Sequence, residues 1–246
     1  MKKTKIFAHR GASAYAPENT MEAFELALAQ GAEGIELDVQ LTKDGVPVVI
    51  HDERVDRVTN GKGEVRGFTL EEIRGFSASN RLPDFEKAKI PTLEEVLELL
   101  APGNCELNIE LKTGIFWYPQ LEEKVVELVE RSGMKERVIY SSFNHYSIQK
   151  IRSLDPEAET AYLFGDILLH AERYARETGV KGLHPALYHM TMGTLAKEYT
   201  ESGLAVRVWT VNEEAHIRRM LEFGVDAIIT NYPDRGARLR DEMEKR

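Results

Sequence analysis

Three acidic side chains occupy positions where buried strands are normally apolar. Glu36 and Asp38 lie in the segment GIELDVQ and Glu110 lies in ELNIELK, and polar and aliphatic residues alternate in both segments. Because side chains two residues apart on a strand share a face, each segment has one polar face and one aliphatic face that suits packing under helices. Carboxylates that face a protein interior cost free energy unless they are paired or bind a metal. The three acids therefore predict a metal site.

The ligand chemistry of these acids indicates which metal they would bind. Three carboxylates form an all-oxygen set, which is typical of Mg²⁺ or Ca²⁺, and Mn²⁺ is a further candidate. Zinc is disfavoured because no His or Cys stands at ligand spacing beside the acids. The acids contribute about −3 and two cations, Arg10 and Lys112, about +2, so a divalent cation brings the site to about +1. That charge matches a phosphodiester, which carries a single negative charge.

Two histidines and the two cations complete a set of groups for phosphodiester chemistry. Arg10 can grip phosphate oxygens with its forked donors, and Lys112 can act on them as a point charge. His9 and His51 exchange protons near neutral pH, so one can take a proton from the attacking oxygen and the other can give one to the leaving alkoxide. With a bound cation, these groups predict metal-assisted cleavage of a phosphodiester.

Other polar and aromatic residues allow more than one interpretation. Phe143 and Trp209, at expected strand ends, either pack in the core or line the apolar flank of a substrate. We interpret Asn19 as a helix cap, with Glu22 three residues later completing a capping box. His184 is left unassigned. Four further histidines are expected on helix or loop surfaces: His145, His170, His189 and His216.

The chain has the alternation of elements needed to bring strand ends together. Strands are expected at about 5–9, 34–40, 106–112, 138–142, 160–164, 182–184, 205–210 and 226–230. Helices are expected at about 20–30, 92–100, 120–131, 147–154, 167–177, 193–201, 213–223 and 233–244. This pattern favours an α/β fold with a parallel sheet, best matched by a (β/α)8 TIM barrel. A doubly wound open sheet is the alternative, but its Gly-rich phosphate-binding turn is missing.

The proposed site residues all map to the carboxyl ends of the expected strands, which form the active-site face of such a barrel. After the second strand, a turn leads into the segment 46–51, which ends at His51. The Gly-rich, polar stretch at about 52–89 then interrupts the alternation, and we interpret it as an inserted loop or lid. Since no linker or repeat signals a second domain, we expect residues 1–246 to form a single domain.

Composition argues against several classes of function. The net charge of −9 over 246 residues disfavours non-specific nucleic-acid binding. The single cysteine, Cys105, cannot form an intrachain disulfide and fits a reducing compartment. The charged start of the chain is followed by only Ile6-Phe7-Ala8, too short a core for a signal peptide, and no stretch reaches transmembrane length. We therefore expect a cytoplasmic protein with no stable membrane association.

Short motifs that include these residues follow one another along nearly the whole chain. In order they are His9-Arg10-Gly11, Pro17-Glu18-Asn19-Thr20, Glu36-Leu37-Asp38-Val39, His51-Asp52, Glu110-Leu111-Lys112, Ser142-Phe143, Trp209-Thr210-Val211-Asn212 and Asp226-Ala227-Ile228-Ile229-Thr230-Asn231-Tyr232-Pro233. The first motif alone is weak evidence, but the ordered set is specific. With it, the chain closely resembles the bacterial, cytosolic glycerophosphodiester phosphodiesterase family.

The resemblance implies a TIM barrel with a small insertion after the second strand. It implies hydrolysis of deacylated phospholipids, such as glycerophosphocholine or glycerophosphoethanolamine, to sn-glycerol 3-phosphate and an alcohol, within glycerol and lipid metabolism. By position, Glu36, Asp38 and Glu110 resemble the metal ligands, and His9 and His51 the acid–base pair. Arg10 and Lys112 resemble the phosphate contacts. Attack by water and attack by a neighbouring glycerol hydroxyl both remain open, and we expect a monomer or a homodimer.

Three other functions fit the sequence less well. A lyase or lysophospholipase D-like enzyme acting on lipid head groups would need an apolar tunnel or a membrane-facing segment, and the sequence offers no convincing one. A non-catalytic barrel scaffold predicts damage to at least one of the two histidines or three acids, yet all are present. A sugar-phosphate isomerase or aldolase on the same fold would not need three clustered acids.

Overall fold

A computed structural model describes residues 3–245. Met1 and Lys2, which belong to the charged start considered above, and Arg246 lie outside the described residues. Within the described part of the chain, no helix is both long enough and apolar enough to span a bilayer.

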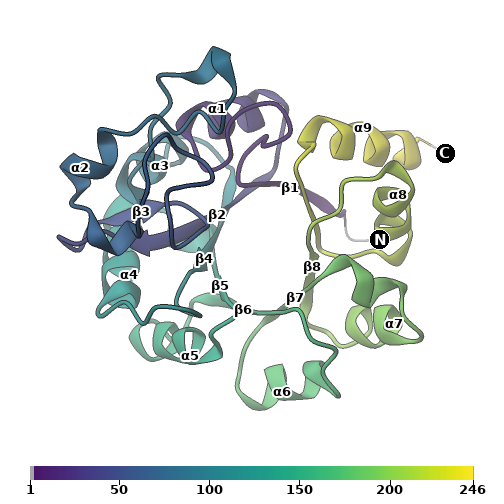
Figure 1. Cartoon of the computed structure of the whole chain (residues 1–246). Coiled ribbons are helices and arrows are strands. Elements are labelled where there is room, and N and C mark those ends of the chain that lie inside the picture. The colour runs from purple at the N-terminus through teal and green to yellow at the C-terminus, as the bar shows by residue number, and fades with distance from the viewer. Residues whose placement is uncertain (1–2, 246) are drawn as a thin grey trace.

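Eight parallel strands close into a barrel (Figure 1). They are β1 (Lys5–His9), β2 (Gly34–Leu41), β4 (Glu106–Leu111), β5 (Val138–Ser142), β6 (Glu159–Phe164), β7 (Gly182–Pro185), β8 (Ala205–Val208) and β9 (Ala227–Thr230). β1 pairs with β9 on one side and with β2 on the other, and this pairing closes the sheet. The predicted (β/α)8 barrel is confirmed, and the alternative of an open doubly wound sheet is wrong.

The alternation within each strand separates the two faces of the barrel wall. Ile35, Leu37 and Val39 of β2 are fully buried in the layer between the strands and the surrounding helices. Phe7 of β1 points the other way and belongs to a small apolar cluster in the barrel interior. A Cβ atom on Gly34 would lie 2.4 Å from the Phe7 ring, so this ring fits only because the facing residue is glycine.

Helices form a ring around the barrel (Figure 1). They are α1 (Met21–Ala29), α3 (Leu93–Leu100), α4 (Leu121–Ser132), α5 (His145–Leu154), α6 (Ala171–Glu177), α7 (Leu195–Thr200), α8 (Glu214–Phe223) and α9 (Pro233–Glu244). Thr92 caps α3: its hydroxyl accepts from the Glu95 amide, and the Glu95 carboxylate accepts from the Thr92 amide at 2.8 Å. Such reciprocal bonds satisfy amides that the first helical turn leaves free.

The predicted cap of α1 is wrong by one residue. Thr20 is the N-cap, and its hydroxyl accepts from the amide of Ala23 at 3.3 Å. Asn19 has a left-handed backbone with φ of 57°, which differs from the extended backbone that a capping residue adopts. Its side chain is therefore free to turn toward β2 instead of toward the helix.

Two loops on the active-site face are longer than predicted. α6 begins at Ala171 instead of near residue 167, because His170 has a left-handed φ of 55° directly before the helix. Residues 165–170 consequently form the β6–α6 loop. β8 ends at Val208, and Trp209 after it makes only an isolated bridge instead of continuing the strand to residue 210.

One of the surface histidine predictions is wrong. His189 is fully buried, and its Nε2 donates to the carbonyl of Gly165 at 3.0 Å. His184, left unassigned above, is also fully buried, with Nε2 3.4 Å from Arg207 Nη1. Burial and that guanidinium hold the pKa of His184 well below its usual range. His170 is exposed, as expected.

The segment between β2 and α3 contains structure that the barrel pattern does not require. β3 (Pro47–Val49) pairs antiparallel with the end of β2. Residues 52–89 then form the 3-10 turns η1 (Val65–Gly67) and η2 (Pro83–Phe85) and the short helix α2 (Leu70–Arg74). This insertion has a hydrophobic cluster of its own, formed by Val48, Ile50, Val55, Val58, Val65, Ile73, Ala78 and Ile90. It lies over the β2 side of the barrel, at the upper left of Figure 1.

Candidate active site

The three acids predicted from the sequence converge on β2 and β4, at the level where β1 ends beside Glu36. Asp38 lies directly beside Glu110 in the parallel register, and Glu36 lies two residues before Asp38 on the same face. One oxygen from each carboxylate falls within a group whose members all lie within 4.8 Å of one another. All three side chains are buried, with residue exposures of 4% for Glu36, 0% for Asp38 and 8% for Glu110.

Two cations compensate part of this buried negative charge. Arg10 Nε lies 3.3 Å from Asp38 Oδ2. Lys112 Nζ lies 2.8 Å from Glu110 Oε1 and 3.8 Å from Asp38 Oδ1. The site therefore carries three acids against two cations, a formal excess of one negative charge when all five are ionised.

The acids differ in their protonation because they share the cations unequally. Burial raises the pKa of Glu36 well above its usual range, and the neighbouring carboxylates of Asp38 and Glu110 raise it further. Burial acts in the same direction on the pKa of Glu110. Burial also opposes ionisation of Asp38, but Arg10 and Lys112 hold its pKa below the usual value. Without a further cation, Glu36 is the acid that retains a proton most readily.

The donor set fits a hard divalent cation. Asp38 Oδ1 and the side-chain oxygen of Asn19 are buried without a hydrogen-bond donor among the described residues. Buried oxygens of this kind need a partner, and carboxylate and amide oxygens are the ligands that Mg²⁺ and Ca²⁺ prefer. The described part of the chain thus contains an acidic cluster that is able to hold a metal.

Asn19 supports this cluster, a role that the sequence analysis missed. Its Nδ2 donates to Asp38 Oδ2 at 2.9 Å, and the residue is 4% exposed. The hydrogen bond fixes one oxygen of Asp38 and leaves the other directed elsewhere. The available signal was the position of Asn19 in a motif shared with the resembled family.

His9, at the end of β1, faces the acids through one ring nitrogen. Its Nδ1 donates to Asn231 Oδ1 at 2.7 Å, and its Nε2 lies 4.0 Å from Glu36 Oε2. Asn231 is held in turn, because its amide donates to Asn212 Oδ1 at 2.9 Å. Burial, followed by the charge of Arg10, lowers the pKa of His9 to about 4. A neutral ring with Nδ1 protonated presents an unprotonated Nε2 to the site.

His51 follows β3 and has a carboxylate partner instead of an amide. Its Nδ1 donates to Asp52 Oδ1 at 2.6 Å, which leaves Nε2 for other contacts. Gln40 of β2 fixes the backbone there, since its Nε2 lies within 3.1 Å of the carbonyl oxygens of residues 50, 51 and 52. Tyr118 in turn donates to Gln40 Oε1 at 2.8 Å. The backbone that carries His51 is thereby tied to the barrel wall.

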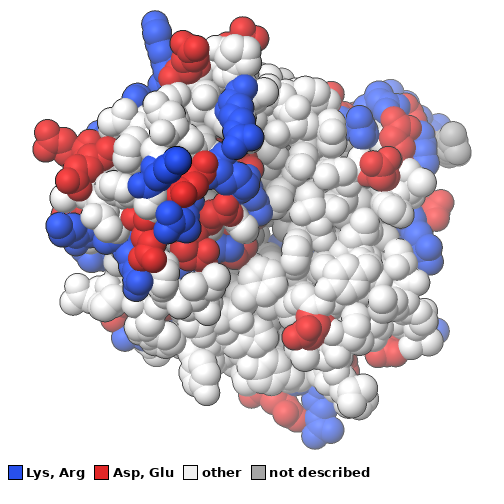
Figure 2. Space-filling model, in the orientation of Figure 1, with Lys and Arg blue, Asp and Glu red and all other residues white. Residues whose placement is uncertain are grey.

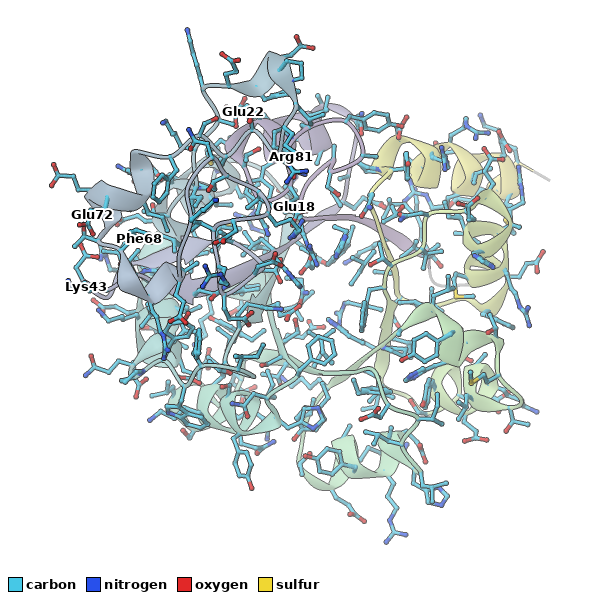
Figure 3. The ribbon with its side chains drawn as sticks, in the orientation of Figure 1. Glu18, Glu22, Lys43, Phe68, Glu72 and Arg81 are labelled. Atoms are coloured by element: carbon cyan, nitrogen blue, oxygen red, sulfur yellow. The ribbon has the colours of Figure 1, made fainter. Side chains whose placement is uncertain are left out.

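A chain of ion pairs links the two halves of the site. Arg57 of the insertion donates to Asp52 Oδ2 at 2.6 Å and to Glu18 Oε2 at 2.7 Å. Glu18 also accepts from Arg10 Nη1 at 2.8 Å, and lies between the insertion and the barrel mouth (Figure 3). Burial opposes ionisation of Asp52, but hydrogen bonds from Arg57 and His51 lower its pKa to about 2. The sequence patterns predicted no role for Glu18 or Arg57.

A cavity of about 120 Å³ opens between these groups. It is lined by His9, Arg10, Glu36, His51, Asn108, Glu110, Phe143, Leu163, Trp209 and Ile229. Phe143 and Trp209 meet edge to face with ring centroids 5.5 Å apart, and Trp209 Nε1 donates to the carbonyl of His184 at 2.7 Å. Of the two interpretations of these aromatics, the structure favours lining of the cavity. Lys112 contacts the acids but is not among the lining residues.

Asn108 is a second residue that the sequence analysis missed. It lies two residues before Glu110 on β4, beside Glu36 in the parallel register, and is 1% exposed. Its side-chain oxygen is buried and has no hydrogen-bond donor among the described residues. The strand period that placed the acids also places Asn108 on their face, so the signal was present.

The acids, cations and histidines gather around one cavity at the carboxyl face of a closed (β/α)8 barrel. This is the face on which barrel enzymes carry their active sites, so the protein belongs to that class. The sequence model of the glycerophosphoryl diester phosphodiesterase family matches residues 9–235. A glycerophosphodiester phosphodiesterase of Bacillus altitudinis is 45% identical over 98% of this chain and 100% of its own length. The chain therefore belongs to the glycerophosphoryl diester phosphodiesterase family.

Solved structures have the same fold. A crystal structure of a glycerophosphodiester phosphodiesterase from Agrobacterium tumefaciens is 34% identical and has a TM-score of 0.83, covering 96% of this chain and 99% of that one. An Oleispira antarctica phosphodiesterase, solved in complex with the product sn-glycerol-3-phosphate, is 28% identical with a TM-score of 0.85 and covers 96% of both chains.

Proposed function

We propose that this chain hydrolyses glycerophosphodiesters, such as glycerophosphocholine and glycerophosphoethanolamine, to sn-glycerol 3-phosphate and an alcohol. The observation that carries the proposal is the cluster of three buried carboxylates, bordered by two cations and two histidines around one cavity. The product bound to the Oleispira antarctica relative is consistent with this reaction.

Glu36, Asp38 and Glu110 would hold a divalent cation, Mg²⁺ or Ca²⁺, with Mn²⁺ as a further candidate. When bound, such an ion withdraws charge from the phosphate oxygens and stabilises the negative charge that develops during cleavage. Without it, the buried acids and cations provide no net positive charge to attract an anionic substrate. The donor set contains oxygen only, which supports a hard cation over zinc.

Arg10 and Lys112 would orient the phosphate. Arg10 is held from two sides by Asp38 and Glu18, so its guanidinium is positioned before substrate binds. Lys112 is 13% exposed at the side chain and is fixed by Glu110. Cationic groups that are already positioned lose little conformational entropy when they bind the phosphate.

His9 would act as the general base and His51 as the general acid. A low pKa keeps His9 neutral near pH 7, and its Nε2 is free to accept a proton from the attacking oxygen. His51 has a carboxylate at Nδ1 that can balance a positive ring, so it suits donation of a proton from Nε2 to the leaving alkoxide. The attacking oxygen belongs either to water or to a neighbouring glycerol hydroxyl. Phe143 and Trp209 would contact the apolar flank of the substrate.

The remaining expectations concern the protein as a whole. We propose that residues 1–246 act as one catalytic domain, in which the insertion at about 52–89 covers part of the site and supports His51 through Arg57. The substrate is a small molecule, and we propose no nucleic-acid partner and no stable membrane association. A monomer or homodimer in the cytoplasm is consistent with the net charge of −9 and the single cysteine.

The proposal is tested by assaying glycerophosphodiester hydrolysis with Mg²⁺, Ca²⁺ and Mn²⁺ in turn, and then in excess chelator. Chelation should abolish the release of sn-glycerol 3-phosphate, and His51→Ala should remove most activity while leaving the thermal unfolding transition in place. Full activity in excess chelator, or a fully active His51→Ala variant, contradicts the proposal.

A further inference from the structure

A larger groove adjoins the catalytic cavity on the side of the β6–α6 loop. Its volume is about 600 Å³, and it shares two lining residues, Phe143 and Leu163, with the catalytic cavity. The two spaces therefore adjoin at these two side chains. A ligand whose phosphate occupies the catalytic cavity would meet the groove on the far side of Phe143 and Leu163.

More of the exposed groove wall is hydrocarbon than polar, and several of its polar atoms already have partners. His145 Nε2 donates to the carbonyl of Leu163 at 3.0 Å, and its Nδ1 lies 3.2 Å from the hydroxyl of Tyr174. The His145 ring also stacks on Tyr162, with ring centroids 3.9 Å apart. The carbonyl of Gly165 accepts from the Nε2 of His189. Among the residues that line the groove, Asp166 is the only acidic one, and His145 is the only one with a basic side chain.

Apolar side chains at the rim of the groove are exposed to water. Of the lining residues, Leu169 is 91% exposed and Phe143 is 43% exposed. Figure 2 shows that charged side chains gather over the insertion, whereas the surface over β6 and β7 is largely uncharged. A leucine in a loop beside an active site gains no stability from such exposure, so a ligand that covers it would bury apolar area.

We propose that this groove binds a linear hydrocarbon chain carried by one alcohol of the phosphodiester. The inference rests on the proposed function and extends it to glycerophosphodiesters with an alkyl or acyl chain. In the reaction, water adds its oxygen to phosphorus, the bond between phosphorus and one ester oxygen breaks, and the alcohol leaves with a proton. A hydrocarbon chain on the substrate needs an apolar surface next to the catalytic cavity, and the groove offers Phe143, Leu163 and Leu169 for this contact.

The test uses diesters of glycerol phosphate with ethanol, butanol, hexanol, octanol and decanol, each below its micelle concentration. In the wild-type enzyme, kcat/KM should rise about two- to fourfold per methylene until the chain outgrows the groove. A short-chain 1-acyl-glycerophosphocholine is assayed beside them, to decide whether the chain is carried by the glycerol or by the other alcohol.

Two variants of the groove and one matched control locate the effect. Leu169→Asn changes a side chain that is 91% exposed, so the fold does not depend on it, and Leu168→Asn changes the adjacent lining residue. Both should flatten the dependence on chain length and leave the ethyl diester within about twofold of wild type. Leu154→Asn, an exposed leucine at the end of α5 remote from the groove, should keep the full dependence.

Several outcomes overturn the inference. Equal kcat/KM for the ethyl and decyl diesters in the wild type refutes a chain-binding groove while leaving the proposed function intact. Selective loss of glycerophosphocholine hydrolysis in Asp166→Asn, with no chain-length effect, assigns the groove to a cationic head group instead. If none of these diesters is hydrolysed, the proposed function fails, and calorimetry still decides the groove: the decyl diester must bind at least tenfold more tightly than the ethyl diester.

Discussion

Glu36→Gln should separate the metal-binding role of the acidic cluster from its role in folding. Glu36 is buried beside Asp38 and Glu110, and these surroundings hold its pKa well above the usual range. In the absence of metal, its neutral form is therefore favoured, and glutamine has nearly the same shape and no charge. Its side-chain oxygen can still accept the amide of Arg10, as Glu36 Oε2 does at 3.1 Å. We expect the variant and the wild type to unfold within about 2 °C of each other in chelator.

A saturating metal should then distinguish the two proteins. Binding to the native state at a free metal concentration of about 100 times Kd stabilises a protein by about 2.7 kcal/mol. For a chain of this size, 1 kcal/mol corresponds to about 2–4 °C in Tm, so the wild type should gain about 5–10 °C. Glu36→Gln loses one of three charged ligands and should gain less than about 2 °C at the same metal concentration.

This difference is measured by thermal unfolding monitored with circular dichroism. Each protein is heated in chelator and, separately, in Mg²⁺, Ca²⁺ or Mn²⁺. Glu106→Gln is the matched control, because Glu106 lies at the opposite end of the same strand, β4, and pairs with Lys5 away from the site. That variant should keep the metal-dependent rise in Tm. If Glu36→Gln is stabilised by metal as much as the wild type is, the assignment of Glu36 as a ligand is refuted.

Three further predictions follow from the same contacts. Metal affinity should rise with pH and binding should release protons, because the raised pKa of Glu36 keeps a proton on a carboxyl that must lose it on coordination. Titration calorimetry in buffers of different ionisation enthalpy measures the number of protons released, and a value of zero contradicts the prediction. Arg57→Ala should lower kcat about tenfold with little effect on Tm, because the loss of the guanidinium frees Asp52 to move with His51. Arg57→Lys should recover part of the rate, and an unchanged kcat in both variants shows that Arg57 does not position His51. Cys105 is 7% exposed, and burial raises the pKa of its thiol to about 12. A thiol reagent at pH 8 should therefore label Cys105 only when the chain unfolds, and rapid labelling of the native protein contradicts this prediction.

The sequence was sufficient for the barrel and for the acids, and the reason is the strand period. Residues two apart share a face, so Glu36 and Asp38 had to point inward once their aliphatic neighbours pointed to the helices. The same rule would have identified Asn108 on the face of Glu110. His9 and His51 followed from their places at strand ends, where the residues of a barrel's active-site face lie.

Contacts between segments far apart in the chain were beyond reach of these local patterns. Asn19 was expected to cap a helix, because Asn before a helical segment usually does so. Instead its backbone adopts a left-handed φ and its side chain donates to Asp38, 19 residues later. His189 in a loop was expected at the surface, but it is buried against the β6–α6 loop. Its burial depends on how that loop packs, which a local pattern does not record.

Periodicity and ordered motifs are local properties of the chain, so they were enough to predict the fold class, the inward acids and the family. The protonation and the positioning of the site residues depend on contacts that form only in the folded protein. The low pKa of His9 arises from burial and from Arg10, and the support of His51 by Arg57 arises where the insertion packs against the barrel. The apolar groove likewise exists only where α5 and the β6–α6 loop meet, because burial and charge pairing depend on distances in space and not on spacing along the chain.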